Sequence, residues 1–257
     1  MIIYKTQKDI EIMVEGGRIL GSILKQVAEK VEPGVGTKDL NQLAEKLIYQ
    51  NNGQPAFKGY KISEEDKPFP TTLCTSINHE IVHAPAEPNR ILKEGDIIGL
   101  DIGMEYQGMY TDTAVTVAVG KVDSDTIKLL KVTQECLNQG IYQFKLGNNL
   151  ADVAKAIQDY VEQHNFSIVR ELVGHGVGKK VHEDPRVPNH VTEEAKYIEI
   201  KKGMTIAIEP MVNIGDWQIE ILSDGWTFAT RDKSLSAQFE HTVAIDHNGE
   251  AIIITQR

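Results

Sequence analysis

The sequence predicts an α+β protein in which helices pack on one face of a curved, mostly antiparallel sheet. Helical periodicity followed by strand-like runs occurs twice along the 257 residues. The two series also echo each other, because "KEGDIIGLD", which ends at Asp101, resembles "KKGMTIAIE", which ends at Glu209. In both segments a carboxylate ends an apolar run six residues after a glycine. Two related halves would bring these strands together about a pseudo-twofold axis.

The first half begins with two predicted helices. From Thr6 onward, apolar residues recur at three- and four-residue steps, which is typical of an amphipathic helix. Thr6 is suited to the N-cap, and Pro33-Gly34 ends the segment. A second helix fits residues 37–51, and the Gly-, Pro- and charge-rich residues 52–72 predict a long surface loop. Strand-like runs follow at 73–77, 96–103 and 111–119.

The second half repeats this order. Helical patterns fit residues 124–144 and 149–164, and "NNLADVAKAIQDYV" resembles "VGTKDLNQLAEKLI" of the first half. Strand-like runs follow at 167–173, 204–212, 217–222 and 237–245. We therefore expect a single domain over residues 1–257, with internal halves of about 1–120 and 121–257. For the similarity between "KEGDIIGLD" and "KKGMTIAIE" alone, the alternative is that Lys-x-Gly is a common turn before a strand.

Composition and charge narrow the classes of function. A content of 41% hydrophobic and 25% charged residues is ordinary for a soluble globular protein. The net charge of −10 argues against nonspecific binding to nucleic acid or to anionic membranes. Two cysteines, Cys74 and Cys136, favour a reducing cytosol over a disulfide-rich secreted protein. The early charges at the N-terminus do not fit a signal peptide, and no run reaches the ~18 apolar residues of a membrane span. We expect a soluble, cytoplasmic monomer.

Two carboxylates lie in a predicted hairpin. Asp101 and Asp112 interrupt apolar runs on neighbouring strands, which a short connection around residues 105–108 joins. Nearly opposite positions would place their Cβ atoms roughly 4.5–5.5 Å apart. Two buried like charges at that separation repel, so that one takes up a proton unless a cation binds. The pair therefore indicates a cation site, and two aspartates that only cap turns are the alternative.

Three further polar residues interrupt strand-like runs. His175 lies between glycines, Glu209 ends an apolar run before a proline, and Glu240 lies within "SAQFEHTVAI". Each alone is more often a hydrogen-bonded polar group than a ligand. Together with the aspartates they form an oxygen-rich set with one imidazole, which is a poor fit to structural zinc. Four carboxylates can neutralise two divalent ions about 3.5–4 Å apart, and Mn²⁺, Fe²⁺, Co²⁺ or Zn²⁺ would all suit.

The motifs taken together resemble those of a known enzyme family. The aspartates separated by ten residues, "GHGVGKKVHEDP", "IEPMV" and "SAQFEHT" are similar to the motifs of methionine aminopeptidases of the short type I form. The resemblance covers nearly the whole chain and implies the pita-bread fold, with two pseudo-symmetric α/β halves. It implies two divalent metal ions, Co, Mn, Fe or Zn, bound by Asp101, Asp112, His175, Glu209 and Glu240. It also implies substrate-site histidines at His83 and His182.

A pocket for the methionine side chain is also implied by the resemblance. Two positions depart from the family pattern, since Phe57 stands where a small residue or Cys is common and Val181 where an aromatic is common. The loop at 58–73 is longer than usual, and "HAPAEP" replaces His-Gly-Ile-Pro. These departures concern the shape of the pocket and the tolerance for the second residue. The pocket residues implied are Tyr60, Cys74 and Trp226.

The implied activity is removal of the N-terminal methionine from nascent proteins and peptides with a small second residue. Water, acidified by the metal ions, would attack the first peptide carbonyl. Glu209 would take its proton and pass it to the leaving amine, His182 would stabilise the oxyanion, and His83 would contact the peptide nitrogen or leaving amine. The expected partners are N-termini of nascent polypeptides, with ribosome association left open. A monovalent-cation loop is implied at Asn78 and Ser236.

Two other functions remain open. A pita-bread Xaa-Pro aminopeptidase or dipeptidase would use the same metal chemistry, although those enzymes usually carry an additional N-terminal domain. A pita-bread binding module that acts on ribosomes or chromatin without catalysis is the second, although such proteins lose metal ligands. Metal content and cleavage of a Met-Ala-Ser peptide would distinguish the three.

Overall fold

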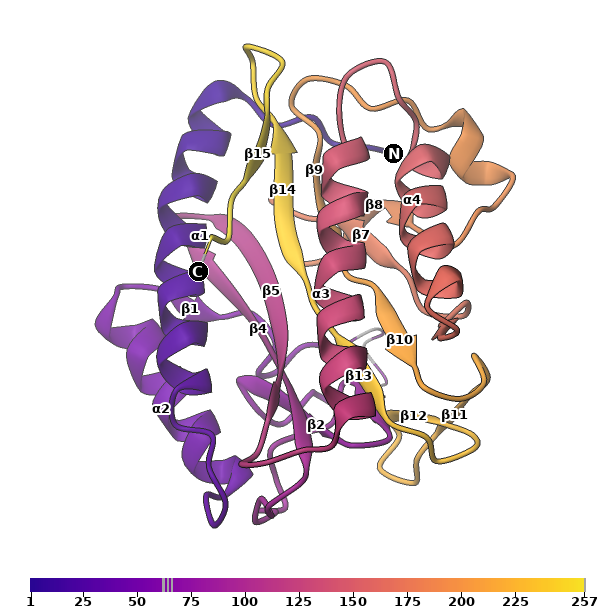
Figure 1. Cartoon of the computed structure of the whole chain (residues 1–257). Helices are drawn as coiled ribbons and strands as arrows, with labels where there is room; N and C mark the ends of the chain where they lie inside the picture. Colours follow the sequence, from indigo (N-terminus) through magenta and orange to yellow (C-terminus); the bar gives the residue numbers. More distant parts are fainter. Residues whose placement is uncertain (62, 64, 66, 257) are drawn as a thin grey trace.

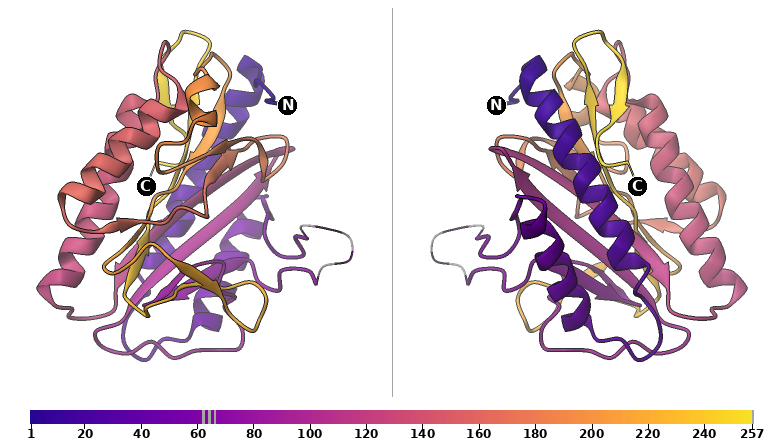
Figure 2. Two further views of the ribbon diagram at one scale, coloured as in Figure 1. Left: turned by 90° about the vertical axis from the view of Figure 1, so that its right-hand side faces the viewer. Right: turned by 90° about the vertical axis from the view of Figure 1, so that its left-hand side faces the viewer.

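The computed structural model describes residues 1–61, 63, 65 and 67–256. Among these residues, four long helices lie outside a set of antiparallel strands, and α3 packs against α4 (Figure 1). The views from the two sides show the helices against the outer faces of the strands (Figure 2). The predicted α+β architecture is confirmed. The helices are α1 (Gln7–Ala28), α2 (Thr37–Gln50), α3 (Ser124–Gln143) and α4 (Leu150–Gln163).

In three of these helices, an aspartate at the third helical position accepts a capping hydrogen bond that fixes where the helix begins. Thr6 Oγ1 accepts from the Asp9 backbone N–H at 3.2 Å, and Asp9 Oδ2 accepts from the Thr6 N–H at 3.0 Å. Such a reciprocal pair satisfies two backbone donors that the first turn leaves free. Asp39 in α2 and Asp152 in α4 accept in the same way from their N-cap N–H groups, at 3.3 and 2.8 Å. Because these two aspartates match in the repeated sequence segments, the repeat extends to its capping chemistry.

The repeated glycines also share a backbone conformation. Gly34 and Gly147 have φ angles of 94° and 88°, and Gly95 and Gly203 have φ angles of 90° and 80°. Residues with a side chain rarely adopt positive φ angles, whereas glycine does so without steric cost. The matched φ angles support the view that both pairs of similar segments are true internal repeats. The division of one domain into two halves remains a prediction.

The strands of the first half surround a long hairpin. Strands β4 (Ile97–Tyr106) and β5 (Met109–Ala118) are joined by a two-residue turn, Gln107-Gly108, with φ angles of 51° and 80°. Positive φ at both positions is typical of the tight turns that match strand twist. Strands β2 (Leu73–Ile77) and β1 (Gln54–Pro55) pair with β4.

Within the part of the chain that the structure describes, the remaining strands form a five-stranded sheet and two smaller sheets. The larger sheet has the order β15 (Ala251–Ile253), β14 (His241–Ile245), β9 (Thr205–Ile208), β7 (Gly174–Gly176) and β8 (Glu183–Val187). One smaller sheet has the order β13 (Ser236–Gln238), β10 (Met211–Asn213) and β6 (Ser167–Ile168). The other has the order β11 (Ile219–Ile221), β12 (Phe228–Thr230) and β3 (Glu80–Val82). A short 3₁₀ helix, η1 (Glu194–Tyr197), lies between β8 and β9.

The hairpin of the predicted first half and the last strands of the predicted second half meet along β5. Glu240, between β13 and β14, donates its backbone N–H to Ala114 O at 3.0 Å. Thr242 Oγ1 donates to Asp112 O at 2.8 Å, and Thr113 Oγ1 donates to Glu240 O at 2.8 Å. These bonds join the hairpin of the first half to the last strands of the second half.

Several strand predictions are wrong in their bounds. Residues 204–212 form two strands in different sheets, because Pro210 cannot donate to a strand ladder, and Glu209 lies at the break. Residues 237–245 divide in the same way into β13 and β14. Of residues 167–173, only Ser167–Ile168 is a strand. The short strands β3, β8, β12 and β15 were not predicted, since three to five residues carry little periodicity.

The predicted register of the hairpin is also corrected. Asp101 pairs with Ala114, and Asp112 pairs with Gly103, so the aspartates are diagonal neighbours on one face and do not lie opposite each other. The two-residue turn sets this register, whereas a longer connection was expected. Diagonal neighbours remain within reach of each other.

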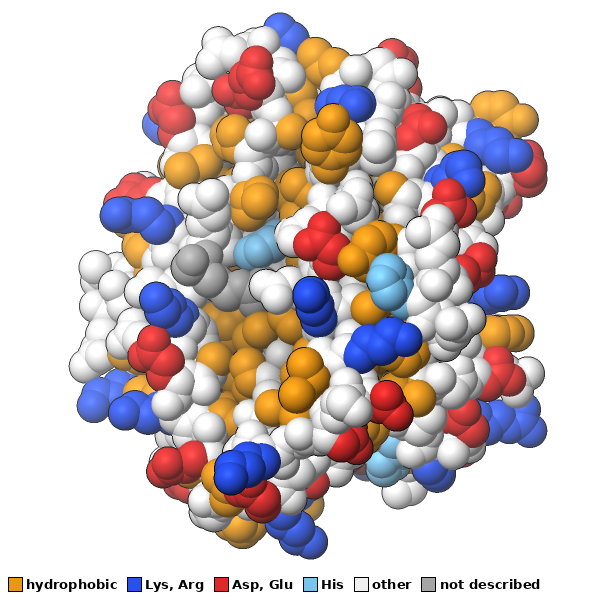
Figure 3. Space-filling view, in the orientation of Figure 1, with side chains coloured by type: hydrophobic (Ala, Val, Ile, Leu, Met, Phe, Trp, Pro, Cys, Tyr) orange, Lys and Arg blue, Asp and Glu red, His pale blue; other side chains and the backbone are white. Residues whose placement is uncertain are grey.

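Apolar side chains form two main clusters, one under each pair of helices. Leu24 and Leu100 belong to the cluster between α1, α2 and the first sheet, and Ile157 and Ile206 to the cluster between α3, α4 and the larger sheet. On the face in Figure 3, acidic and basic side chains are interspersed. Within the described chain, no helix has both the length and the apolar character needed to cross a membrane.

Candidate active site

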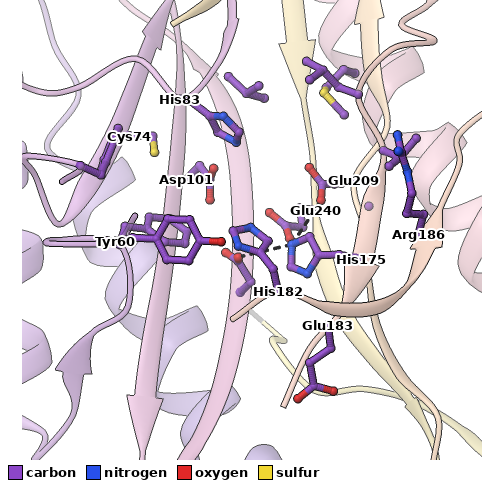
Figure 4. A pocket seen from close by; sticks show the side chains of 18 of the residues that line it. Tyr60, Cys74, His83, Asp101, His175, His182, Glu183, Arg186, Glu209 and Glu240 are labelled. Carbon is purple, nitrogen blue, oxygen red and sulfur yellow. Dashed lines mark ion pairs between the residues drawn. The ribbon is translucent and has the colours of Figure 1, made fainter. Parts of the chain in front are cut away.

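The five predicted metal ligands line one cavity where the two halves meet, and Figure 4 labels all of them except Asp112. The strands β4, β5 and β7 carry three of them, and the breaks after β9 and β13 carry the other two. Their carboxylate residues are only 2–8% exposed. A strand that stops at its ligand can turn the side chain toward the junction while the strand itself stays in its sheet. These residues are Asp101, Asp112, His175, Glu209 and Glu240.

The histidine lies among the carboxylates. His175 Nε2 is 3.5 Å from Glu209 Oε1 and 3.9 Å from Asp112 Oδ2. Ligand atoms of Asp112, His175 and Glu240 all lie within 4.8 Å of one another, close enough to hold one ion. His175 Nδ1 is 2.9 Å from Gly176 O, so a proton on Nδ1 leaves the Nε2 lone pair facing the carboxylates.

Burial changes the ionisation of this cluster. Loss of hydration raises the pKa of Asp112, and the charges of Glu240 and Asp101 raise it further. Burial likewise raises the pKa of Glu209 and Asp101, and both aspartates add to the effect at Glu209. Burial lowers the pKa of His175 to about 4, which keeps its imidazole neutral and able to bind a cation.

The cluster fits a divalent metal site. Asp101 Oδ1 and Asp112 Oδ1 are buried and accept no hydrogen bond from the described residues. Buried carboxylate oxygens without partners are costly, and a cation is the ligand that would satisfy them. Carboxylates with one imidazole suit hard and borderline divalent ions.

Two residues that the sequence analysis missed support Glu209. Gln238 Nε2 donates to Glu209 Oε2 at 3.3 Å, and Asn189 Nδ2 donates to Glu209 O at 3.1 Å. Both supporting side chains are almost fully buried. Gln238 lies within the quoted "SAQFEHT", so its proximity to Glu240 was a usable signal, whereas Asn189 follows no pattern.

His83 approaches the site from the loop after β3. It has a φ angle of 61°, an uncommon conformation for a residue with a side chain. The Arg90 guanidinium holds this loop, because Nη1 binds Glu80 at 2.5 and 2.7 Å while Nη2 donates to Thr75 O at 2.5 Å and Pro85 O at 3.1 Å. Such strain persists where the surroundings determine the conformation. Burial lowers the pKa of His83 to about 4, so it is neutral at pH 7.

His182 stands at the mouth of the same cavity. Its ring lies edge-on to His175 with centroids 4.4 Å apart, and to Tyr60 with centroids 5.0 Å apart. Loss of hydration, followed by the charge of His175, lowers the pKa of His182. Both predicted substrate histidines therefore border the carboxylate cluster as neutral rings (Figure 4).

An apolar pocket adjoins the cluster in a cavity of about 560 Å³. The three predicted pocket residues, Tyr60, Cys74 and Trp226, all line it. Phe57 also lines the cavity. Val181 does not line it, but belongs to the same cluster of buried apolar residues as Phe57 and Cys74.

Comparison with known proteins now identifies the family. The family described as metallopeptidase family M24 matches residues 11–247. Methionine aminopeptidase 1 of Bacillus subtilis is 44% identical over 98% of this chain and 99% of its own length. The chain belongs to the methionine aminopeptidases of this metallopeptidase family. The crystal structure of a methionine aminopeptidase from Thermotoga maritima has a TM-score of 0.93 and 41% identity, and each chain covers 100% of the other. A prolidase from Pyrococcus furiosus shares the fold alone. It has a TM-score of 0.76 and 21% identity, and the match covers 99% of this chain and 66% of that one.

These comparisons confirm the predicted pita-bread fold and the metal-dependent hydrolase. The methionine aminopeptidase resemblance drawn from the motifs is likewise confirmed. Membership of a metallopeptidase family agrees with the group of Asp112, His175 and Glu240.

The pocket of this family member contains one aromatic residue that the sequence analysis missed. Phe69 packs edge-on against Trp226, with centroids 5.3 Å apart and planes at 83°. It reaches the cavity because Gly59 donates to Phe69 O and Phe69 donates to Tyr60 O, both at 2.8 Å, which closes the base of the long loop. The loop at 58–73, predicted to be longer than usual, includes residues 62, 64 and 66, which lie outside the described residues.

The residues implied for a monovalent cation also lie together. Ser236 donates its N–H to the Asn78 carbonyl at 2.9 Å, and Asn78 has a φ angle of 57°. Ser236 Oγ is buried and has no hydrogen-bond partner among the described residues. A cation at this loop stays a prediction. The buried Ser236 hydroxyl, which has no hydrogen-bond partner among the described residues, agrees with that prediction.

Proposed function

We propose that this chain removes the N-terminal methionine of new polypeptides by metal-dependent hydrolysis, with a preference for a small second residue. The observation that carries the proposal is the adjacency of a buried carboxylate cluster, two neutral histidines and an apolar pocket in one cavity. The high identity to proteins named methionine aminopeptidase over nearly the whole chain supports the same activity.

Five side chains would hold two divalent ions, taken from Co, Mn, Fe or Zn. Four carboxylates support this number, since two doubly charged ions would neutralise them, and so do Asp101 Oδ1 and Asp112 Oδ1, which have no hydrogen-bond partner among the described residues. When bound, such ions acidify water and polarise a carbonyl oxygen. The proposed ligands are Asp101, Asp112, His175, Glu209 and Glu240, which line the same cavity.

Protein side chains would move the protons of the reaction. Glu209 is the proposed general base, which takes a proton from the attacking water and passes it to the leaving amine. Burial raises the pKa of Glu209, which favours its holding the proton between the two transfers, and Gln238 fixes its orientation. His182, as a neutral ring, can donate an N–H to the carbonyl oxygen as negative charge develops there. His83 would contact the peptide nitrogen or the leaving amine.

The apolar pocket would receive the methionine side chain. Four aromatic residues, Tyr60, Trp226, Phe57 and Phe69, offer ring edges against which a thioether sulfur packs favourably, and the Cys74 thiol adds a small apolar surface. Bulky second residues would collide with His83 and His182, which border the cavity, and this is the reason for the expected preference for Gly, Ala or Ser.

Steady-state cleavage of four peptide series tests the proposal. Met-Ala peptides should be cleaved faster than Leu-Ala peptides and much faster than Met-Leu peptides, in protein of measured metal content. An apolar pocket discriminates by about 1–3 kcal/mol per methylene, so slow cleavage of Leu-Ala is expected. Faster cleavage of Xaa-Pro peptides than of Met-Ala peptides would favour the proline-specific alternative.

The physiological setting is a further part of the proposal. The expected substrates are N-termini of nascent polypeptides, processed in the cytoplasm by a monomer, and docking on the ribosome remains open. Size-exclusion chromatography with light scattering would test the monomer. Co-sedimentation with ribosomes, with and without a nascent chain, would test the docking.

A further inference from the structure

A buried lysine connects the N-terminal segment to the loop that carries His182. Lys5 Nζ lies 2.5 Å from Glu183 Oε2, and the two side chains are 1% and 2% exposed. Glu183 follows His182 in the chain, yet its carboxylate points away from the carboxylate cluster in Figure 4. A buried ion pair often stabilises a protein no more than well-packed apolar residues would, because both charges lose their hydration. The pair is therefore better explained by the conformation that it specifies.

Glu183 closes the loop of residues 178–183 upon itself. Its Oε1 accepts from the backbone N–H groups of Lys179 at 2.5 Å and Lys180 at 2.9 Å, while Oε2 binds Lys5. Gly178 accepts from the Tyr110 N–H at 2.7 Å, which joins the start of the loop to β5. Every end of the loop is thus held, and both oxygens of Glu183 are used.

Lys5 is itself fixed by the surrounding backbone. Its N–H donates to Gly203 O at 2.7 Å, its carbonyl lies 3.1 Å from His247 Nε2, and Nζ also donates to Ile3 O at 2.9 Å. The loop packs closely on the lysine stem, since a Cβ added to Gly178 would lie 2.2 Å from Lys5 Cε. The loop therefore has little freedom to move while Lys5 keeps its place.

We propose that the Lys5–Glu183 ion pair positions His182, so that the N-terminal segment takes part in aligning the active site. The inference rests on the oxyanion role proposed above for His182. Val181 precedes His182 in the same loop and packs with Phe57, so the same pair also supports the wall behind the pocket. Lys5 and Glu183 are positioning residues, which act through their neighbour and do not touch the substrate.

A double-mutant cycle with His182 tests the inference. Lys5→Met removes the charge and keeps most of the stem, and a displaced donor should lower kcat on Met-Ala-Ser by roughly 10- to 100-fold. The matched control is Lys179→Met, which breaks the ion pair from the same loop to Asp9, where the lysine side chain is 47% exposed. The control should stay within about twofold of the wild-type kcat. In the His182→Ala background, Lys5→Met should cost little further.

Two outcomes would overturn the inference. Equal losses of kcat from Lys5→Met with and without His182 would reveal a general structural role, and an unchanged kcat in Lys5→Met would remove the role altogether. Because an unpaired Glu183 can prevent folding, the double variant Lys5→Met/Glu183→Gln provides a neutral pair of similar shape. It should fold and still show the reduced kcat, and full activity would count against the ion pair.

A second readout does not depend on catalysis. The ring signals of His182 in NMR spectra, assigned by their loss in His182→Ala, should shift in Lys5→Met and stay in place in Lys179→Met. If His182→Ala kept the wild-type kcat, the proposed role of His182 would fail, and the NMR shifts would still report whether Lys5 positions the ring. Unshifted signals in both Lys5 variants would refute the positioning itself.

Discussion

Phe57→Ala should change the choice of the first residue of the substrate. The Phe57 side chain lines the cavity and packs with Phe69 and Cys74. Its ring occupies space beside β4 that Gly103 leaves open, because a Cβ at Gly103 would lie 2.7 Å from Phe57 Cε1. Removal of the ring would therefore widen the pocket next to the strand that carries Asp101.

The size of the effect can be worked out from burial. Phe57 is 8% exposed, and truncation of a buried Phe to Ala costs about 3–5 kcal/mol of unfolding free energy. For a chain of 257 residues, each kcal/mol shifts the melting temperature by about 2 °C, so a fall of about 6–10 °C is expected. The added space should raise kcat/KM for Phe-Ala-Ser relative to Met-Ala-Ser by about tenfold, which corresponds to about 1.4 kcal/mol.

A matched substitution separates specificity from stability. Phe166 is 9% exposed and packs in the cluster under α3 and α4, away from the cavity. Phe166→Ala should lower the melting temperature by a similar amount and leave the ratio of the two kcat/KM values unchanged. If Phe57→Ala also left that ratio unchanged, Phe57 would be a core residue without influence on specificity, and the pocket assignment would be wrong.

Three further outcomes are expected. Asp112→Ala should abolish metal binding and hydrolysis together in a folded protein, and wild-type metal stoichiometry by elemental analysis would contradict its place among the ligands. His182→Ala and His83→Ala should each lower kcat by roughly 10²–10³ with metal retained, and loss of the metal would instead make that histidine a ligand. In metal-free protein, burial raises the pKa of Asp101, Asp112 and Glu209. The folded state therefore holds more protons than the unfolded state, and it loses stability as the pH rises from the ordinary pKa of a carboxyl group through the raised pKa of these three groups. Above pH about 6.5, where ordinary histidines are neutral, the gap in melting temperature between metal-loaded and metal-free protein should widen, and a constant gap would contradict this linkage.

Local signals in the sequence were sufficient to predict the helices and to select the proposed metal ligands, whose role stays a prediction. The strand at 73–77 and the N-cap at Thr6 were predicted as observed, because periodicity and capping depend on neighbours along the chain. The proposed ligands stood out because a carboxylate in an apolar strand has no local explanation. The register of Asp101 and Asp112 was missed because a two-residue turn, read as a longer connection, shifts every cross-strand pair.

Contacts between distant segments could not be predicted in this way. Lys5 and Glu183 are 178 residues apart, and neither interrupts a periodic pattern. Phe69 lies in a loop rich in Pro and charge, where an aromatic residue carries no sign of burial until the backbone closes the loop upon Tyr60. The supporting residues around a site are in general fixed by tertiary packing, so they become visible only when the halves are brought together.

The placement of the carboxylates explains why the junction of the halves is suited to a cation. Asp101 and Asp112 come from the first half, and Glu209 and Glu240 from the second, so that closing the junction brings four acidic groups into a buried space. Backbone and hydroxyl hydrogen bonds along β5 hold that junction, and repulsion among the carboxylates opposes them. Divalent ions would remove the repulsion at the place where the two halves meet. The same bound metal would therefore serve catalysis and join the two halves, which is why the difference in melting temperature with pH is a sensitive test of the site.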